Sequence, residues 1–97
     1  MKFGADMLRE LAAHHKRMCR QVWCGTGQYI YFCDGQNVPI SKWKVEYPCQ
    51  NPTKIEIERG YVIVKGHIDQ MDEKGMRVIG WYPTKEDLEA DDWMIIE

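Results

Sequence analysis

Residues 76–97 read MRVIGWYPTKEDLEADDWMIIE, and the rest of the chain must fold around this stretch. It predicts a strand over Met76–Trp81, a break at Pro83, a short helix and a closing strand over Trp93–Ile96, because proline has no N–H to give to a strand ladder. Thr84 followed three positions later by Asp87 is typical of a capping box at a helix start. A segment this short cannot bury the two tryptophans that bracket its helix. We therefore expect the other elements to pack against it.

Working back from this stretch, the residues alternate between β-rich runs and turns. Residues 72–75 (DEKG) predict a hairpin loop that ends in glycine, and Tyr61–Gln70 is the longest β-rich run. Thr53–Glu58 (TKIEIE) alternates strictly between polar and apolar residues, which predicts a half-buried strand. Residues 34–52 predict mostly loop, with one short strand near Lys44–Tyr47.

The first third of the chain predicts a helix and a hairpin. Apolar residues recur at helical spacing over residues 3–14. Residues 17–23 alternate as a strand, residues 24–27 (CGTG) form a turn, and residues 28–33 (QYIYFC) are aromatic and β-branched, as expected of a second strand. The predicted fold class is α+β: an N-terminal helix packed on one mostly antiparallel sheet, with a short helix before the last strand. We expect residues 1–97 to form a single domain.

Composition and charge argue against several classes of protein. The chain has 97 residues, 44% of them hydrophobic, and its 13 basic residues are interspersed with 15 acidic ones. A protein that grips nucleic acid normally carries a basic stripe, and no apolar run approaches the roughly 20 residues of a membrane span. Charges at Asp6, Arg9 and Glu10 interrupt any signal peptide. We expect a soluble, cytoplasmic protein that binds neither nucleic acid nor membrane and has free thiols.

Candidate catalytic and metal sites are weak. His14 and His15 lie at a predicted helix end and His67 lies within a predicted strand, and none belongs to a recognisable nucleophile motif. The cysteines are unevenly spaced along the chain, without the two matching pairs of a structural zinc site. We therefore expect no catalytic residue, no metal and no cofactor.

A binding site for a small, anionic, aromatic ligand has better support. Such a site needs rings that stack on a base, N–H groups or an arginine for phosphates, and polar groups for ribose. The turn at residues 24–27, flanked by Arg20 and Trp23, would supply N–H groups to this site. The second half of the chain would supply Trp81, Tyr82, Thr84 and the corner at residues 91–93. The simpler alternative is that at least two of the four tryptophans are core residues.

These residues also carry a resemblance. The first half reads Lys2-Phe3-Gly4, then Arg20-x-x-Trp23-x-Gly25-x-Gly27-x-Tyr29. The second half reads His67-Ile68-Asp69, a turn closing at Gly75, Gly80-Trp81, an acidic helix with Asp87, Asp92-Trp93 and the acidic last residue Glu97. In this order they resemble the second family of Thoeris anti-defence proteins, which are small phage proteins. The resemblance leaves out roughly residues 34–60.

The resemblance implies a function. Family members bind and sequester, without cleaving it, the cyclic ADP-ribose isomer that the TIR-domain enzymes of the Thoeris system make, so that the effector is not switched on. Some relatives take up cyclic dinucleotides, and the family includes an anti-CRISPR protein. Members form homotetramers with nucleotide pockets between protomers. This chain would accordingly be a non-enzymatic sponge in the cytoplasm of the infected bacterial host.

The resemblance also implies two walls of a ligand site. In the first, Trp23 would stack on adenine beside the turn at residues 24–27, and Arg20 would either face a phosphate or orient the turn. The second wall would be formed by the Trp81–Thr84 turn and Asp91, from the same or a neighbouring protomer. Many relatives have asparagine where this chain has Cys24. The implied ligand-binding residues are Arg20, Trp23, Cys24, Gly25, Thr26, Gly27, Tyr29, Trp81, Tyr82, Thr84, Asp87 and Asp91.

Two other functions stay open from the sequence. A protein-binding inhibitor, for example of a CRISPR nuclease, would use an acidic surface that imitates nucleic acid. A small nucleotide hydrolase would need a base and usually a metal ion. The acidic surface would consist of Glu86, Asp87, Glu89, Asp91 and Asp92.

Overall fold

The computed structural model describes residues 1–96, so that Glu97, the acidic last residue of the resemblance, lies outside the described residues. Contacts divide the chain into two compact units, one built from residues 1–34 with the segment that starts at His67, and one from residues 35–66. The fold class is α+β, as predicted. No helix in the described part is long and apolar enough to cross a membrane.

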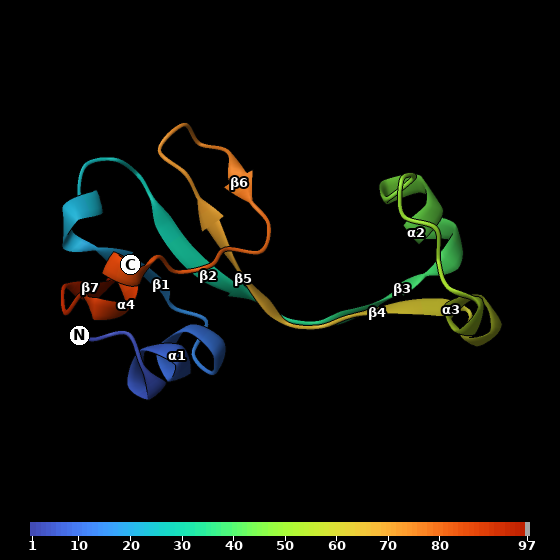
Figure 1. Ribbon diagram of the computed structural model, residues 1–97, viewed down its shortest axis with the longest axis horizontal. Coiled ribbons are helices and arrows are strands. Elements are labelled where there is room, and N and C mark those ends of the chain that lie inside the picture. Colours follow the sequence, from blue (N-terminus) through green and yellow to red (C-terminus); the bar gives the residue numbers. More distant parts are fainter. Residues whose placement is uncertain (97) are drawn as a thin grey trace. The chain divides into compact units, whose positions relative to one another are not determined.

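The first unit contains a five-stranded antiparallel sheet with the strand order β6-β5-β2-β1-β7 (Figure 1). A 3-10 turn over Gln21–Trp23 follows β1. The strands of this sheet are β1 (Arg17–Arg20), β2 (Tyr29–Cys33), β5 (His67–Met71), β6 (Arg77–Val78) and β7 (Trp93–Ile96), and the helices of the unit are α1 (Ala5–Ala12) and α4 (Lys85–Glu89).

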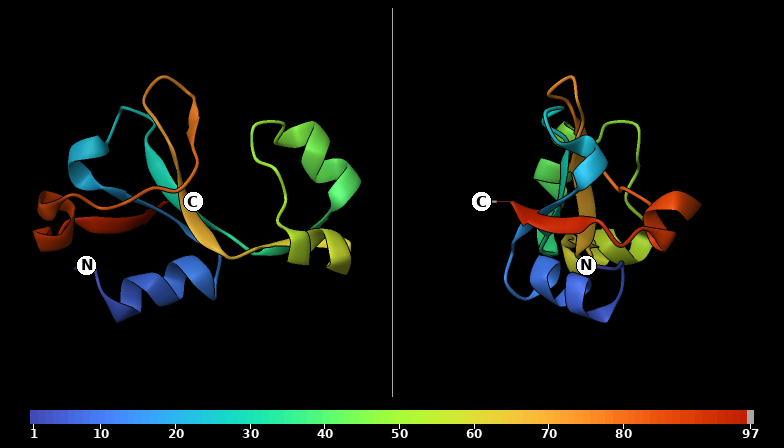
Figure 2. Two further views of the ribbon diagram at one scale, coloured as in Figure 1. Left: turned by 45° about the vertical axis from the view of Figure 1, so that its right-hand side comes forward. Right: turned by 90° about the vertical axis from the view of Figure 1, so that its left-hand side faces the viewer.

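The core of this unit lies between α1 and one face of the sheet (Figure 2). Met7 and Leu11 of α1 are fully buried against Met18 of β1 and Ile30 of β2. Trp93 of β7 is 2% exposed, and its indole N–H donates to the Asp87 carbonyl at 2.9 Å. The helix predicted at the N-terminus therefore packs on the sheet as expected, although it is shorter than residues 3–14.

The C-terminal stretch folds largely as its sequence predicts. The Asp87 N–H donates to Thr84 Oγ1 at 3.1 Å and the Thr84 N–H donates to Asp87 Oδ2 at 2.9 Å, so the capping box is confirmed. The strand predicted over Met76–Trp81 is wrong in length, since β6 covers only two residues. The chain turns at Gly80, which has φ of 77°, and the Trp81 N–H then donates to the Ile68 carbonyl at 2.7 Å.

Two other predicted strands also differ from the structure: one is shorter than predicted and one is divided in two. The strand predicted over residues 17–23 ends at Arg20, because the chain winds into the 3-10 turn, in which the Cys24 N–H donates to the Gln21 carbonyl at 3.0 Å. The run Tyr61–Gln70 is two strands rather than one. Its first part, β4 (Tyr61–Val64), pairs with β3 (Gln36–Pro39) in the second unit, and its second part belongs to β5, which pairs with β2.

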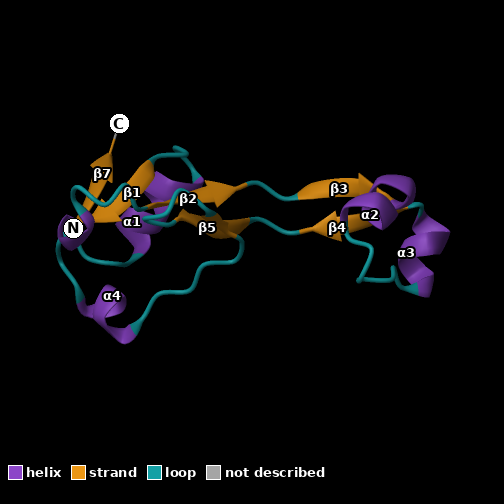
Figure 3. Cartoon of the chain, turned by 90° about the horizontal axis from the view of Figure 1, so that it is seen from above, coloured by secondary structure: helices purple, strands orange, loops and turns teal. Residues whose placement is uncertain are grey.

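The second unit corrects three predictions. It contains a two-stranded sheet of β3 (Gln36–Pro39) and β4 (Tyr61–Val64), with α2 (Ile40–Glu46) and α3 (Lys54–Arg59) between them along the chain (Figure 3). The expected loop over residues 34–52 is therefore wrong, as is the strand expected near Lys44–Tyr47. The expectation of one sheet is also corrected by this second, smaller sheet.

The predicted strand over Thr53–Glu58 is a helix because of its capping residues. The Glu56 N–H donates to Thr53 Oγ1 at 3.2 Å and the Thr53 N–H donates to Glu56 Oε1 at 2.8 Å. These two hydrogen bonds close a capping box around the first turn. Ile55 and Ile57, whose alternation suggested a half-buried strand, are 70% and 55% exposed. The alternation therefore reflects no buried face.

Candidate functional site

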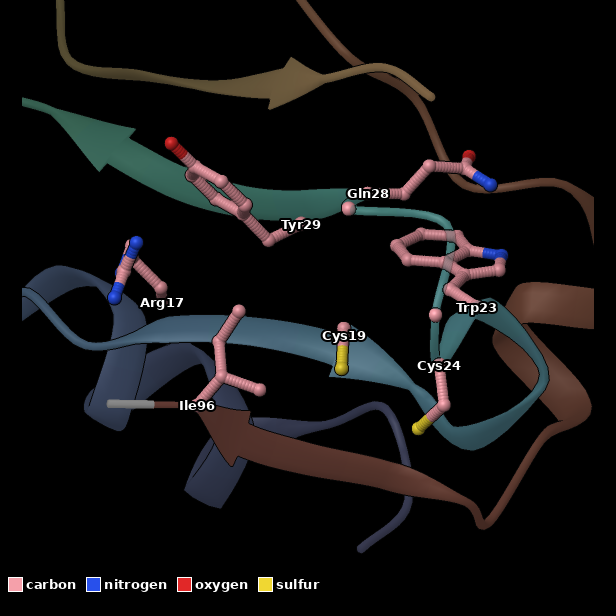
Figure 4. Close-up of a pocket in the computed structure, with 9 residues that line it drawn as sticks. Arg17, Cys19, Trp23, Cys24, Gln28, Tyr29 and Ile96 are labelled. Carbon is pink, nitrogen blue, oxygen red and sulfur yellow. The ribbon is translucent and has the colours of Figure 1, made fainter. Parts of the chain in front are cut away.

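One cavity of the first unit, about 410 Å³ in volume, opens beside the turn between β1 and β2 (Figure 4). This volume is within the range of small-molecule sites, which runs from about 300 to 1,000 Å³. Arg17 and Ile96 lie at one end of the cavity and Trp23 with Cys24 at the other, with Cys19 between them. The lining residues are Arg17, Cys19, Trp23, Cys24, Gly25, Gly27, Gln28, Tyr29 and Ile96.

Strand alternation places this cavity on the sheet face opposite α1. Met18 and Ile30 point into the core under α1, so their neighbours Cys19 and Tyr29 point to the other face. Arg17 is the register partner of Ile96 in the antiparallel pair of β1 and β7. The cavity floor is therefore formed by three adjacent strands.

The turn at residues 24–27 is held by its own hydrogen bonds. The Thr26 hydroxyl donates to the Trp23 carbonyl at 2.5 Å, and the Gln28 N–H donates to Thr26 Oγ1 at 3.2 Å. Gly25 and Gly27 both have φ of 83°. This left-handed conformation costs residues other than glycine free energy. The predicted turn is thus confirmed, and its shape depends on these two glycines.

The cavity combines a cation, two aromatic side chains and a fixed amide. The Arg17 guanidinium lies 5.0 Å from the centre of the Tyr29 ring. The half-buried Trp23 packs edge-on against Trp93, with ring centres 5.2 Å apart. The Gln28 side chain donates to Thr26 Oγ1 at 3.2 Å and accepts from Gln70 at 3.3 Å. These groups match the requirements of an anionic ligand with a flat ring.

The two cysteines at this cavity are free thiols. Burial, and the neighbouring Cys24, raise the pKa of the Cys19 thiol above its ordinary value. A thiol with a raised pKa stays protonated near neutral pH and is a poor nucleophile. Cys19 therefore contributes shape to the cavity rather than reactivity.

Much of the first predicted wall gathers here. Trp23, Cys24, Gly25, Gly27 and Tyr29 line the cavity. Thr26 braces the turn through its hydroxyl without lining the cavity. The sequence argument missed four lining residues, and the period-two alternation around Met18 was the signal that could have found Arg17. The missed residues are Arg17, Cys19, Gln28 and Ile96.

Arg20 lies outside this lining and forms two ion pairs. Its Nε is 3.0 Å from Asp92 Oδ1 and its Nη1 is 3.2 Å from Asp87 Oδ1. The side chains of Arg20 and Asp87 are 15% and 8% exposed. The hydrogen bond from Arg20 holds the pKa of Asp92 below its usual value. Of the two roles that the sequence left open for Arg20, this geometry matches positioning, because it joins the end of β1 to α4.

The residues of the second predicted wall do not line this cavity within one chain. Trp81 packs against Phe3 and Trp93, with ring centres 6.4 and 6.0 Å away. Tyr82 is 85% exposed. Asp91 is exposed, and its carbonyl accepts a hydrogen bond from the N-terminal ammonium group at 3.1 Å. Within one chain, neither these residues nor Thr84 and Asp87 line the cavity.

Comparison with protein families identifies the family of this chain. Residues 1–96 match a family model described as the Thoeris anti-defense 2-like domain (Tad2-like). The match includes residues 34–60, which the resemblance had left out, and so extends over both units. A search of curated proteins found no match.

Proposed function

The chain belongs to the Thoeris anti-defense 2-like family, and we propose that it counters Thoeris by binding a cyclic nucleotide signal and holding it chemically unchanged. A Thoeris anti-defence function follows from the family. The identity of the nucleotide, its sequestration and the assembly of the protein go beyond the family match and belong to this proposal. The proposed ligand is a cyclic ADP-ribose isomer, with cyclic dinucleotides as a second class.

The observation that carries this proposal is the composition of the cavity. Trp23 and Tyr29 supply the aromatic rings for a base, and the Arg17 guanidinium, which lies over the Tyr29 ring, supplies a charge for a phosphate. The glycine turn brings backbone close to the ligand without a side chain in the way. This set of groups recognises a nucleotide without needing to react with it.

The chemistry of the lining supports retention rather than cleavage. Among the described residues that line the cavity there is no histidine and no carboxylate to serve as a general base. The thiol of Cys19 has a raised pKa, which disfavours nucleophilic attack. A sponge works by mass action, since it must bind the signal more tightly than the effector does and be present in excess.

The proposed assembly completes the site. The resemblance implies a homotetramer with pockets between protomers. In this assembly a neighbouring protomer would supply the second wall of the ligand site. Tyr82 is 85% exposed and is therefore free of the core to make such a contact. We place this assembly in the cytoplasm of the infected bacterial host, where the signal is made.

A thermal-shift panel tests the proposal. Cyclic ADP-ribose isomers and cyclic dinucleotides are each added to the full chain, with linear ADP-ribose and AMP as matched controls. At a hundredfold excess over Kd a ligand adds about 2.7 kcal/mol of stability, which raises the Tm of a domain of this size by about 10 °C or more. We expect this shift for at least one cyclic nucleotide. No shift with any of them would contradict the proposal.

The rival function, an inhibitor with a nucleic-acid-like acidic surface, has less support. Asp87 is buried, and both Asp87 and Asp92 are paired with Arg20. Of the five carboxylates of that surface, Glu86, Glu89 and Asp91 are exposed. Calorimetry separates the two functions, because only a sponge binds free nucleotide when no partner protein is present.

A further inference from the structure

A second group of chemically active side chains lies in the first unit and lines no part of the cavity. Cys33 ends β2, and His67 and Asp69 belong to β5. One ligand atom from each, a sulfur, an imidazole nitrogen and a carboxylate oxygen, all lie within 4.8 Å of one another. Cys33 and His67 are register partners, and Asp69 follows two residues later on the same face.

The carboxylate of Asp69 is the centre of this group. The Cys33 thiol donates to Asp69 Oδ2 at 3.1 Å, and His67 Nε2 lies 3.2 Å from Asp69 Oδ1. The Gly80 N–H also donates to Oδ1, at 2.8 Å. Asp69 is 2% exposed, whereas the His67 side chain is 32% exposed. The carboxylate is thus held in place, and the partly exposed imidazole makes the group accessible to an ion from solvent.

The separations fit a tetrahedral ion. With bonds of about 2.0 Å to nitrogen and oxygen and about 2.3 Å to sulfur, the ligand atoms of a zinc site lie about 3.3–3.5 Å apart. The Cys33 sulfur lies 3.1 Å from Asp69 Oδ2, close to these values, and one ligand atom from each of the three residues lies within 4.8 Å of the others. We propose that Cys33, His67 and Asp69 bind one divalent transition-metal ion, Zn²⁺ best, with water in the fourth position.

The donor set selects the metal. A thiolate and an imidazole favour Zn²⁺ over Mg²⁺ or Ca²⁺, which prefer oxygen ligands. One thiolate and one carboxylate balance the charge of the ion. Oδ2 of Asp69 would bind the metal while Oδ1 keeps the hydrogen bond from Gly80, the kind of outer contact that orients a ligating carboxylate.

Cys33 would bind the metal as its thiolate. Without metal, burial and the hydrogen bond to Asp69 raise the pKa of the Cys33 thiol to about 11. A metal-bound cysteine is deprotonated, so metal binding releases the thiol proton to solvent. The same raised pKa disfavours Cys33 as a nucleophile. Bound metal would cross-link β2 and β5.

Cobalt substitution tests the site directly. The full chain is stripped with a chelator and titrated with Co²⁺ alone. We expect one ion per chain, tetrahedral visible bands and a near-ultraviolet thiolate-to-cobalt band that Zn²⁺ abolishes. Cys33→Ser should lose the thiolate band, and His67→Gln should raise the Kd for Co²⁺ at least tenfold. Cys49→Ser and His14→Gln, at exposed positions, serve as matched controls and should leave both unchanged.

Two results would overturn the proposal. Absence of the thiolate band from the unmodified chain would show that the three side chains form only a hydrogen-bond network. Persistence of the band in Cys33→Ser would place the metal at another cysteine. Added Zn²⁺ should also raise the Tm of the stripped chain, and equal Tm values with and without Zn²⁺ would count against a site that ties β2 to β5.

Discussion

Replacing Trp23 with alanine is expected to raise the Kd for the cyclic nucleotide about a hundredfold. Stacking of a base on an aromatic side chain contributes about 1–3 kcal/mol, and each 1.4 kcal/mol is about a factor of ten in Kd. Trp23 is the larger of the two aromatic residues at the cavity and lies beside the glycine turn. Isothermal titration of both proteins with the ligand found in the thermal-shift panel measures the ratio.

The controls separate a binding effect from a folding effect. Trp23 also packs against the buried Trp93, so Trp23→Ala must be compared at a temperature where both proteins are folded. Trp23→Phe keeps a ring and should lose less affinity. Trp43→Ala removes an indole of α2 that stacks on Tyr47 at 4.2 Å and does not line the cavity, and it should bind normally. An unchanged Kd for folded Trp23→Ala would contradict the stacking role.

Arg20→Ala is expected to lower the free energy of unfolding by about 3 kcal/mol. The substitution leaves the buried carboxylate of Asp87 without its cation, and removal of one partner from a buried ion pair is strongly destabilising. Urea unfolding monitored by tryptophan fluorescence measures the loss. Arg9→Ala is the matched control, because the pair of Arg9 with Asp6 is 3.5 Å long and largely exposed, and it should change little. Equal losses for the two variants would refute this role of Arg20.

The second ion pair of Arg20, with Asp92, should make stability depend on pH. Arg20 lowers the pKa of Asp92 in the folded chain below the ordinary value of 3.8. Unfolded chains then bind more protons than folded ones between the two values, so stability falls as the pH falls. The contribution is fully present above the unfolded pKa and is lost as the pH drops through the folded pKa. Arg20→Ala should lack this acid-sensitive part of the unfolding curve.

The sequence predicted well those features that depend on residues close together in the chain. The box formed by Thr84 and Asp87 depends on residues three positions apart, so the short helix could be recognised without any tertiary information. The turn at residues 24–27 likewise depends on its own glycines. Trp23 and Tyr29, which flank that turn, could therefore be placed together in advance.

The errors come from features that only the folded chain decides. Thr53 and Glu56 have the same three-residue spacing as the C-terminal box, but the alternation of Ile55 and Ile57 was read as a strand. Arg17 begins the strand predicted over residues 17–23, but nothing in the sequence indicated a cavity on its face of the sheet; in the structure it pairs with Ile96 and lines the cavity. The ligand-binding role of Asp87 stays a prediction; its side chain bonds to the helix start and to Arg20 and is buried within one chain.

The chemical fate of the bound signal tests the central claim most directly. The full chain is loaded with the cyclic nucleotide that shifts its Tm, freed of unbound ligand by gel filtration and denatured by heat. Mass spectrometry and chromatography then identify the released nucleotide. We predict release of the intact cyclic molecule in stoichiometric amounts, even after a long incubation. Recovery of a linear, hydrolysed product would contradict the account.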